Sequence, residues 1–154
     1  IGVDFYPTLL EVTQTDAPED YLLDGVSFVP LLRNSATKLK RKAIHWHFPA
    51  YLQGYTARHG HFRTTPAGAI RIGDWKLIEF FEDGTLELYN TDKDISEKKN
   101  LAKKMPAKVK EMHEVMLAWR KETNAPVPTK LNPAYDPKSA KQGKDKKKGK
   151  KRIE

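Results

Sequence analysis

The chain has 154 residues, of which 31% are charged and 38% hydrophobic, and it carries a formal net charge of +8 and no cysteine. This length suits one domain with a modest core. The lack of cysteine excludes disulfides and thiolate chemistry. No apolar stretch approaches the roughly 18 residues that a membrane-spanning helix needs, so no membrane span is expected. The first residues have neither the basic region nor the cleavage site of a signal peptide.

The positive charge is concentrated at the C-terminal end. Residues 138–154 contain nine Lys or Arg against two acidic residues, which leaves about +1 for the rest of the chain. This Lys-rich tail has almost nothing apolar to bury, so we expect it to be disordered. It could attract nucleic acid through counterion release. It has no aromatic side chain to stack on bases, so no specific nucleic-acid partner is expected.

Two short helices are predicted within residues 1–42. In "DFYPTLLEV", Asp4 is a candidate N-cap and Pro7 falls in the first helical turn. In "VSFVPLLRN", Ser27 is a candidate cap, and Leu32 is expected to pack inward with the leucine before it. The first helix would gather three apolar side chains near one face, namely Phe5, Leu9 and Val12.

Residues 43–90 predict an antiparallel sheet of about four strands. The stretch "AIHWHF" alternates apolar residues with histidines, and Asp83-Gly84 marks a tight hairpin between "WKLIEFF" and "LELYN". Apolar side chains on both faces of residues 75–81 indicate a strand that is covered on each side. One cover would be the chain's own helix and the other a partner. Residues 49–67 are expected to form a long loop.

A longer helix is predicted from about residue 106 to residue 123. Its apolar residues recur at helical spacing, Pro106 suits its first turn, and Asn124 suits its end. The expected apolar stripe is formed by Val109, Met112, Met116 and Trp119. The three tryptophans, Trp46, Trp75 and Trp119, are all expected in the core.

Taken in order, these segments resemble the C-terminal part of a formylglycine-dependent sulfatase. They are similar to the end of bacterial sulfatases related to N-sulfoglucosamine sulfohydrolase, over roughly residues 1–137. The segments that carry the resemblance are "DFYPTLLEV", "DGVSFVPLL", "HWHFPAY", "GAIRIGDWKLIEFFEDGTLELYN", "ISEKKNLAKKMP" and "NPAYDP". The resemblance implies an α+β fold, the C-terminal subdomain of an alkaline-phosphatase-like sulfatase. Residues 1–42 would be a helical lead-in from an N-terminal catalytic domain, 43–137 the subdomain itself, and 138–154 a tail.

The resemblance also implies a chemistry that this chain cannot perform alone. Such enzymes hydrolyse sulfate esters or sulfamates with a formylglycine made from Cys or Ser in a C/S-x-P-x-R motif, assisted by calcium. The chain has no Cys, none of its Ser residues begins such a motif, and no Asp pair matches the family's metal cluster. We therefore expect no catalytic residue, no metal site and no cofactor here. The expected partners are a missing N-terminal sulfatase domain and a sulfated carbohydrate, in a periplasmic or secreted enzyme.

The candidate substrate-binding residues lie in and after the stretch "HWH". His45 and His47 project from one face of a strand. They could bind zinc if His59 or His61 supplied a third ligand, form hydrogen bonds at a domain seam, or contact substrate. The following loop adds Tyr51, Arg58 and Arg63, and the two arginines can fork onto sulfate oxygens. Two rival functions remain open: a non-catalytic module that binds anionic glycans, and a nucleic-acid binder that uses the basic tail.

Overall fold

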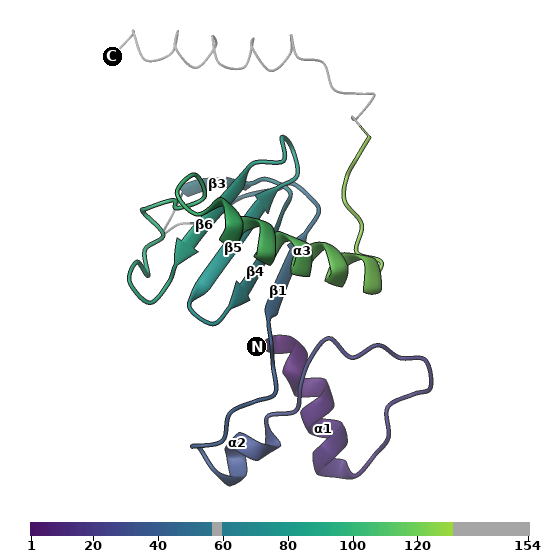
Figure 1. The fold of residues 1–154 in the computed structure, drawn as a ribbon. Coiled ribbons are helices and arrows are strands. Elements are labelled where there is room, and N and C mark those ends of the chain that lie inside the picture. Colours follow the sequence, from purple (N-terminus) through teal and green to yellow (C-terminus); the bar gives the residue numbers. More distant parts are fainter. Residues whose placement is uncertain (57–59, 131–154) are drawn as a thin grey trace, which may run out of the picture.

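The computed structural model describes residues 1–56 and 60–130. The expected tail, residues 138–154, lies outside this part of the chain. The elements in chain order are η1 (Gly2–Asp4), α1 (Phe5–Thr13), α2 (Val29–Arg33), β1 (Ile44–Phe48), β2 (Leu52–Thr56), β3 (Gly60–Thr64), β4 (Ala67–Ile72), β5 (Trp75–Phe80), β6 (Leu86–Asn90) and α3 (Pro106–Glu122). Figure 1 shows α3 lying across one face of a sheet, with α1 and α2 grouped beyond the end of β1.

The predicted antiparallel sheet is confirmed. Four strands pair in the order β1-β4-β5-β6, and every pair is antiparallel. The hairpin between β5 and β6 turns at Gly84, whose φ of +71° is a conformation that glycine adopts without steric cost. The predicted helix over residues 106–123 is confirmed as α3, which ends where Asn124 adopts a positive φ of 54°.

The long loop expected over residues 49–67 is partly wrong. Two of its stretches, β2 and β3, form a separate two-stranded antiparallel sheet. Its register pairs Leu52 with Thr64 and Tyr55 with His61. The two strands pair their backbone donors and acceptors, and their Thr, Tyr and Phe residues favour the strand conformation. The hairpin therefore forms without the apolar alternation on which the strand predictions depended.

The core lies between the four-stranded sheet and α3. Ile70, Leu77 and Leu88 from three neighbouring strands meet Met112 and Met116 of the helix, and all five are buried. The helical stripe predicted these two methionines correctly. Trp75 and Val109 pack around this cluster. Strands β4, β5 and β6 thus present one face of the sheet to α3.

Strand β1 turns its two aromatic residues away from α3. Trp46 and Phe48 are 44% and 43% exposed, so the prediction that Trp46 lies in the core is wrong. Alternation along the strand explains this result, since turning His45 and His47 toward the helix forces their neighbours to the opposite face. The inward packing expected for Leu32 is also wrong, because that side chain is 69% exposed.

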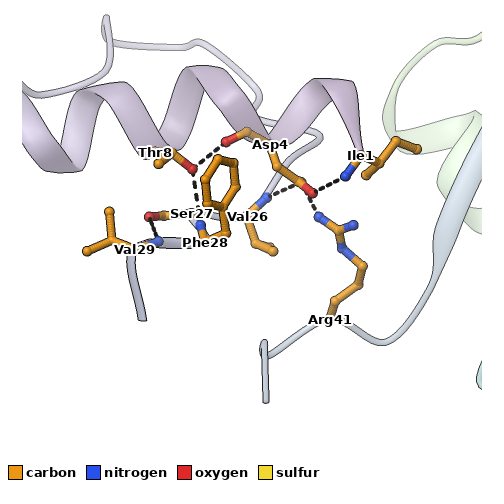
Figure 2. A network of polar contacts seen from close by, with 8 residues as sticks. All are labelled: Ile1, Asp4, Thr8, Val26, Ser27, Phe28, Val29 and Arg41. Carbon is orange, nitrogen blue, oxygen red and sulfur yellow. Dashed lines mark hydrogen bonds and ion pairs between the residues drawn. The ribbon is translucent and has the colours of Figure 1, made fainter. Parts of the chain in front are cut away.

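A buried carboxylate ties together distant segments of the lead-in (Figure 2). Asp4 accepts hydrogen bonds from the backbone N–H of Val26 at 3.0 Å and from the guanidinium of Arg41. Thr8 donates to the Asp4 carbonyl at 2.6 Å and accepts from the Phe28 N–H at 3.0 Å. The predicted N-cap role of Asp4 is wrong, since its side chain makes no capping bond to α1. Its carboxylate joins distant segments instead.

Candidate functional site

The histidines of β1 lie on the face that α3 covers. The imidazole of His45 stacks on the indole of Trp119, with ring centroids 4.6 Å apart and an interplanar angle of 4°. The ring of His47 lies at a tilt to the same indole, at 6.1 Å. Both histidines are half-buried. The end of α3 therefore forms one side of the environment of this histidine pair.

His47 is held by a hydrogen bond as well as by contacts with aromatic rings. Its Nε2 atom lies 2.6 Å from the carbonyl oxygen of Pro126, just beyond the end of α3. A carbonyl oxygen only accepts, so Nε2 carries the proton and donates it. The ring also tilts against Phe81 at 5.3 Å. Gly68 of β4 pairs with His47 of β1. Its missing side chain leaves room for Phe81, because a Cβ at this position would lie 3.1 Å from the Phe81 ring.

A small cavity of about 50 Å³ lies beside His45. Asp24 and Arg41 from the lead-in contribute to its lining, together with His45 and Trp119. The Nδ1 atom of His45 is buried and has no hydrogen-bond partner among the described residues. Burial lowers the pKa of His45, and the Asp24 carboxylate opposes that shift only in part. Burial therefore favours the neutral form of this imidazole.

An ion-pair cluster fixes the last turns of α3 on the sheet. Arg120 is buried and pairs with the Glu79 carboxylate of β5, and its guanidinium lies 5.2 Å from the centroid of the Phe81 ring. The Nε2 atom of His113 lies 3.2 Å from the same carboxylate. The His113 side chain is half-buried against β5.

The remaining candidate residues follow β1 in the chain. The Tyr51 ring is 54% exposed, and its hydroxyl donates to the carboxylate of Glu82. Arg58 and His59 lie outside the described residues. His61 and Arg63 lie on β3, but their side chains lie outside the described part of the structure. The structure thus brings together the two β1 histidines and leaves the predicted roles of the loop residues untested.

The described residues also bear on the zinc hypothesis. Among them, no group of three or more His, Asp or Glu side chains is placed to hold a metal ion. His45 and His47 contact Trp119 and Pro126, and a third ligand from His59 or His61 lies outside what the structure describes.

Sequence analysis missed the aromatic and backbone partners of the histidines. Trp119 stood out only as the last residue of the apolar stripe. One signal was available. If Trp46 faces away from α3, alternation along β1 turns both histidines toward the apolar stripe of that helix. Phe81 and the Pro126 carbonyl carried no such signal, because their contacts depend on how loops return to the sheet.

A small antiparallel sheet with one helix packed on it fits an accessory subdomain. A family model described as "N-sulphoglucosamine sulphohydrolase, C-terminal" matches residues 1–122. Over 137 residues the chain is 31% identical to a sulfatase of Formosa agariphila, covering 80% of this chain and 23% of that protein. Over 106 residues it is 31% identical to arylsulfatase K of Danio rerio, covering 68% and 18%.

Solved structures give the same result. The structure of BT4656 in complex with its substrate D-glucosamine-2-N,6-O-disulfate aligns with a TM-score of 0.63 and 28% identity, over 82% of this chain and 25% of that one. The fold of the chain is that of the C-terminal domain of alkaline-phosphatase-like sulfatases. The chain belongs to the N-sulphoglucosamine sulphohydrolase C-terminal family, and it spans a quarter or less of these three relatives.

The residues present do not fit the cofactors that the family resemblance implies. Formylglycine requires a Cys or Ser in C/S-x-P-x-R, and the sequence has none. A calcium site requires several converging oxygen ligands, and the described residues offer no carboxylate cluster of that kind. Within the same residues, no helix combines the length and the apolar character needed to cross a bilayer.

Proposed function

We propose that this chain is the C-terminal part of a sulfatase that hydrolyses sulfate esters or sulfamates of a carbohydrate, in the periplasm or outside the cell. In this proposal it supplies scaffold and one wall of the substrate pocket, while the catalytic centre lies in another domain. The family match supports the enzyme class. The substrate printed for BT4656, D-glucosamine-2-N,6-O-disulfate, supports a sulfated sugar.

The observation that carries the proposal is a pair of uncovered apolar faces. On the sheet, Trp46 and Phe48 face away from α3 and remain more than two-fifths exposed. On α1, Phe5 and Leu9 are 61% and 58% exposed. Apolar patches of this kind mark surfaces that another protein part covers. The occupant we propose is an N-terminal sulfatase domain, corresponding to the part of the relatives that this chain does not span.

The proposed division of labour places the chemistry in that other domain. A formylglycine hydrate would supply the attacking oxygen there, and calcium would stabilise the sulfate charge. The sequence has no C/S-x-P-x-R motif, and the described residues include no group of acidic side chains placed to hold a metal ion. We therefore assign no catalytic residue to this chain.

The proposed contribution of this chain is a substrate-binding rim. The rim is formed by His45, His47, Tyr51, Arg58, His59, His61 and Arg63. Imidazole and guanidinium groups can donate charge-assisted hydrogen bonds to sulfate oxygens. His47 uses Nε2 to donate to Pro126, so its Nδ1 atom is left to accept a bond from a sugar hydroxyl.

The coding sequence upstream of Ile1 tests the first part of the proposal. An in-frame C/S-x-P-x-R motif and a cluster of Asp and Asn ligands are the expected result. A start codon and a signal peptide directly before Ile1 would contradict it, and would favour the glycan-binding module.

Kinetics of a His47→Ala variant test the rim. In the full-length sulfatase, the variant should lose about tenfold in kcat/KM on D-glucosamine-2-N,6-O-disulfate, the equivalent of one good hydrogen bond. Turnover of 4-nitrophenyl sulfate, which lacks the sugar, should change much less. His113→Ala is the control, since His113 lies on α3 beside Glu79. Equal losses on both substrates would place His47 in folding or in the chemical step and overturn its role in the rim.

A further inference from the structure

We propose that Trp119 is a positioning residue for the rim: its indole, held at the end of α3, sets the orientation of the His45 imidazole. This inference rests on the proposed function, because the orientation matters only if His45 faces the saccharide. It adds a residue from α3 to a site otherwise built from β1 and the segment after it.

Ring stacking holds the His45 imidazole in place. Its ring lies flat on the indole of Trp119, at 4.6 Å and 4°. Its Nδ1 atom has no hydrogen-bond partner among the described residues. An imidazole whose Nδ1 atom is not held by a hydrogen bond can still turn about its side-chain torsions. A parallel ring of this kind removes that freedom, since only a flat approach keeps the contact area and the favourable stacking geometry.

Trp119 is itself fixed by its neighbours in α3. Its neighbour Arg120 is buried and paired with Glu79, and Met116, one turn earlier, is buried in the core. The Trp119 carbonyl accepts the backbone N–H and the hydroxyl of Thr123, both at 2.9 Å. The packing of Met116 and Arg120 and the two hydrogen bonds from Thr123 hold the backbone of Trp119 in place. The indole can therefore act as a rigid platform.

His47 differs from His45 in its contacts and serves as an internal control. His47 has a hydrogen bond to Pro126 and a contact with Phe81, and it meets Trp119 only at a tilt and at 6.1 Å. Removal of the indole should therefore free His45 and leave His47 largely in place. A general loss of packing would instead disturb both residues.

Proton NMR of the 154-residue chain tests the stacking directly. The ring protons of His45 should be shifted upfield by the indole and show cross-relaxation with the ring protons of Trp119. Trp119→Leu should abolish the shift and raise the pKa of His45 toward its ordinary value, because burial is what lowers it. Trp119→Phe should keep most of the shift, and the resonances of His47 should move little.

Either of two spectroscopic results would overturn the inference. One is an unmodified chain without cross-relaxation between these rings, which requires no variant to fold. The other is a Trp119→Leu chain, with unchanged resonances from the buried Ile70 and Leu77, in which His45 and His47 shift equally.

Kinetics of the full-length sulfatase separate this inference from the proposed function. Trp119→Leu should raise KM for D-glucosamine-2-N,6-O-disulfate about threefold or more, as expected for a weakened hydrogen bond, and Trp119→Phe should restore it. Leu117→Ala, at an exposed position of the same helix, is the control and should leave KM and kcat on the sugar unchanged. If His45→Ala raises this KM and Trp119→Leu does not, the positioning role is wrong and the rim stands. If neither His45→Ala nor His47→Ala raises it, the rim is wrong and the positioning role falls with it.

Discussion

At the scale of single residues, Asp4 illustrates how a local pattern can mislead. Its place before a helix predicted an N-cap, but its carboxylate binds Val26 and Arg41, which lie 22 and 37 residues away. The sequence offers no sign of these partners. Burial alone would raise the pKa of Asp4, but hydrogen bonds from Arg41, the Ile1 amino group and Val26 outweigh burial, and the pKa is lowered.

This lowered pKa predicts a loss of stability in acid. Because the folded-state pKa lies below the unfolded one, Asp4 stabilises the fold above about pH 4, and the contribution disappears as the pH falls through the folded-state pKa. Urea denaturation over a pH series should show that Asp4→Asn flattens this acid dependence. The exposed Asp16→Asn serves as the control and should keep the original slope. An Asp4→Asn chain with an unchanged slope would contradict the account.

At the scale of elements, the spacing of apolar residues predicted the elements that pack against the core. The strands β1, β4, β5 and β6 and the helix α3 followed from alternation, a turn glycine and an apolar stripe. The hairpin of β2 and β3 was missed, because its pairing is set by backbone hydrogen bonds across a stretch without a clear apolar face. The orientation of β1 was missed as well. Alternation shows that Trp46 and His45 face opposite sides, but only tertiary packing decides which of them meets α3.

The contact between α3 and β5 gives a prediction at this scale. Arg120 and Glu79 form a largely buried ion pair, so Arg120→Leu should destabilise the chain by about 3–5 kcal/mol, since it leaves the carboxylate unpaired. The double variant Arg120→Leu with Glu79→Leu should recover much of that loss. Chemical denaturation of the parent chain, the two single variants and the double variant measures these changes in the free energy of unfolding. Losses that simply add in the double variant would show that the two side chains do not interact.

At the scale of the whole molecule, the fold is complete on one side only. The core between α3 and the sheet is closed, whereas Trp46 and Phe48 on the sheet and Phe5 on α1 remain exposed. The sequence indicated this partner face through the apolar groups on both sides of β5. It could not show which residues form the face, because that depends on the orientation of β1.

These exposed faces predict self-association of the isolated chain. Sedimentation velocity should show concentration-dependent association, because apolar patches without their partner bind one another. Replacing Trp46 and Phe48 with Thr should reduce it, while strand propensity is kept. Ile95→Thr is the control, since this residue is 83% exposed but lies in a loop between β6 and α3. A monodisperse parent chain at high concentration would argue against an uncovered interface.

The most direct test of the central claim is an activity measurement with and without the remainder of the enzyme. Purified alone, the 154-residue chain should hydrolyse neither D-glucosamine-2-N,6-O-disulfate nor 4-nitrophenyl sulfate, with or without calcium, because it lacks a formylglycine motif. The full-length sulfatase, matured in a host that makes formylglycine, should turn over a sulfated sugar. Calcium-dependent turnover by the isolated chain would contradict the account, because the chemistry would then reside in residues to which we assign only scaffold and substrate binding.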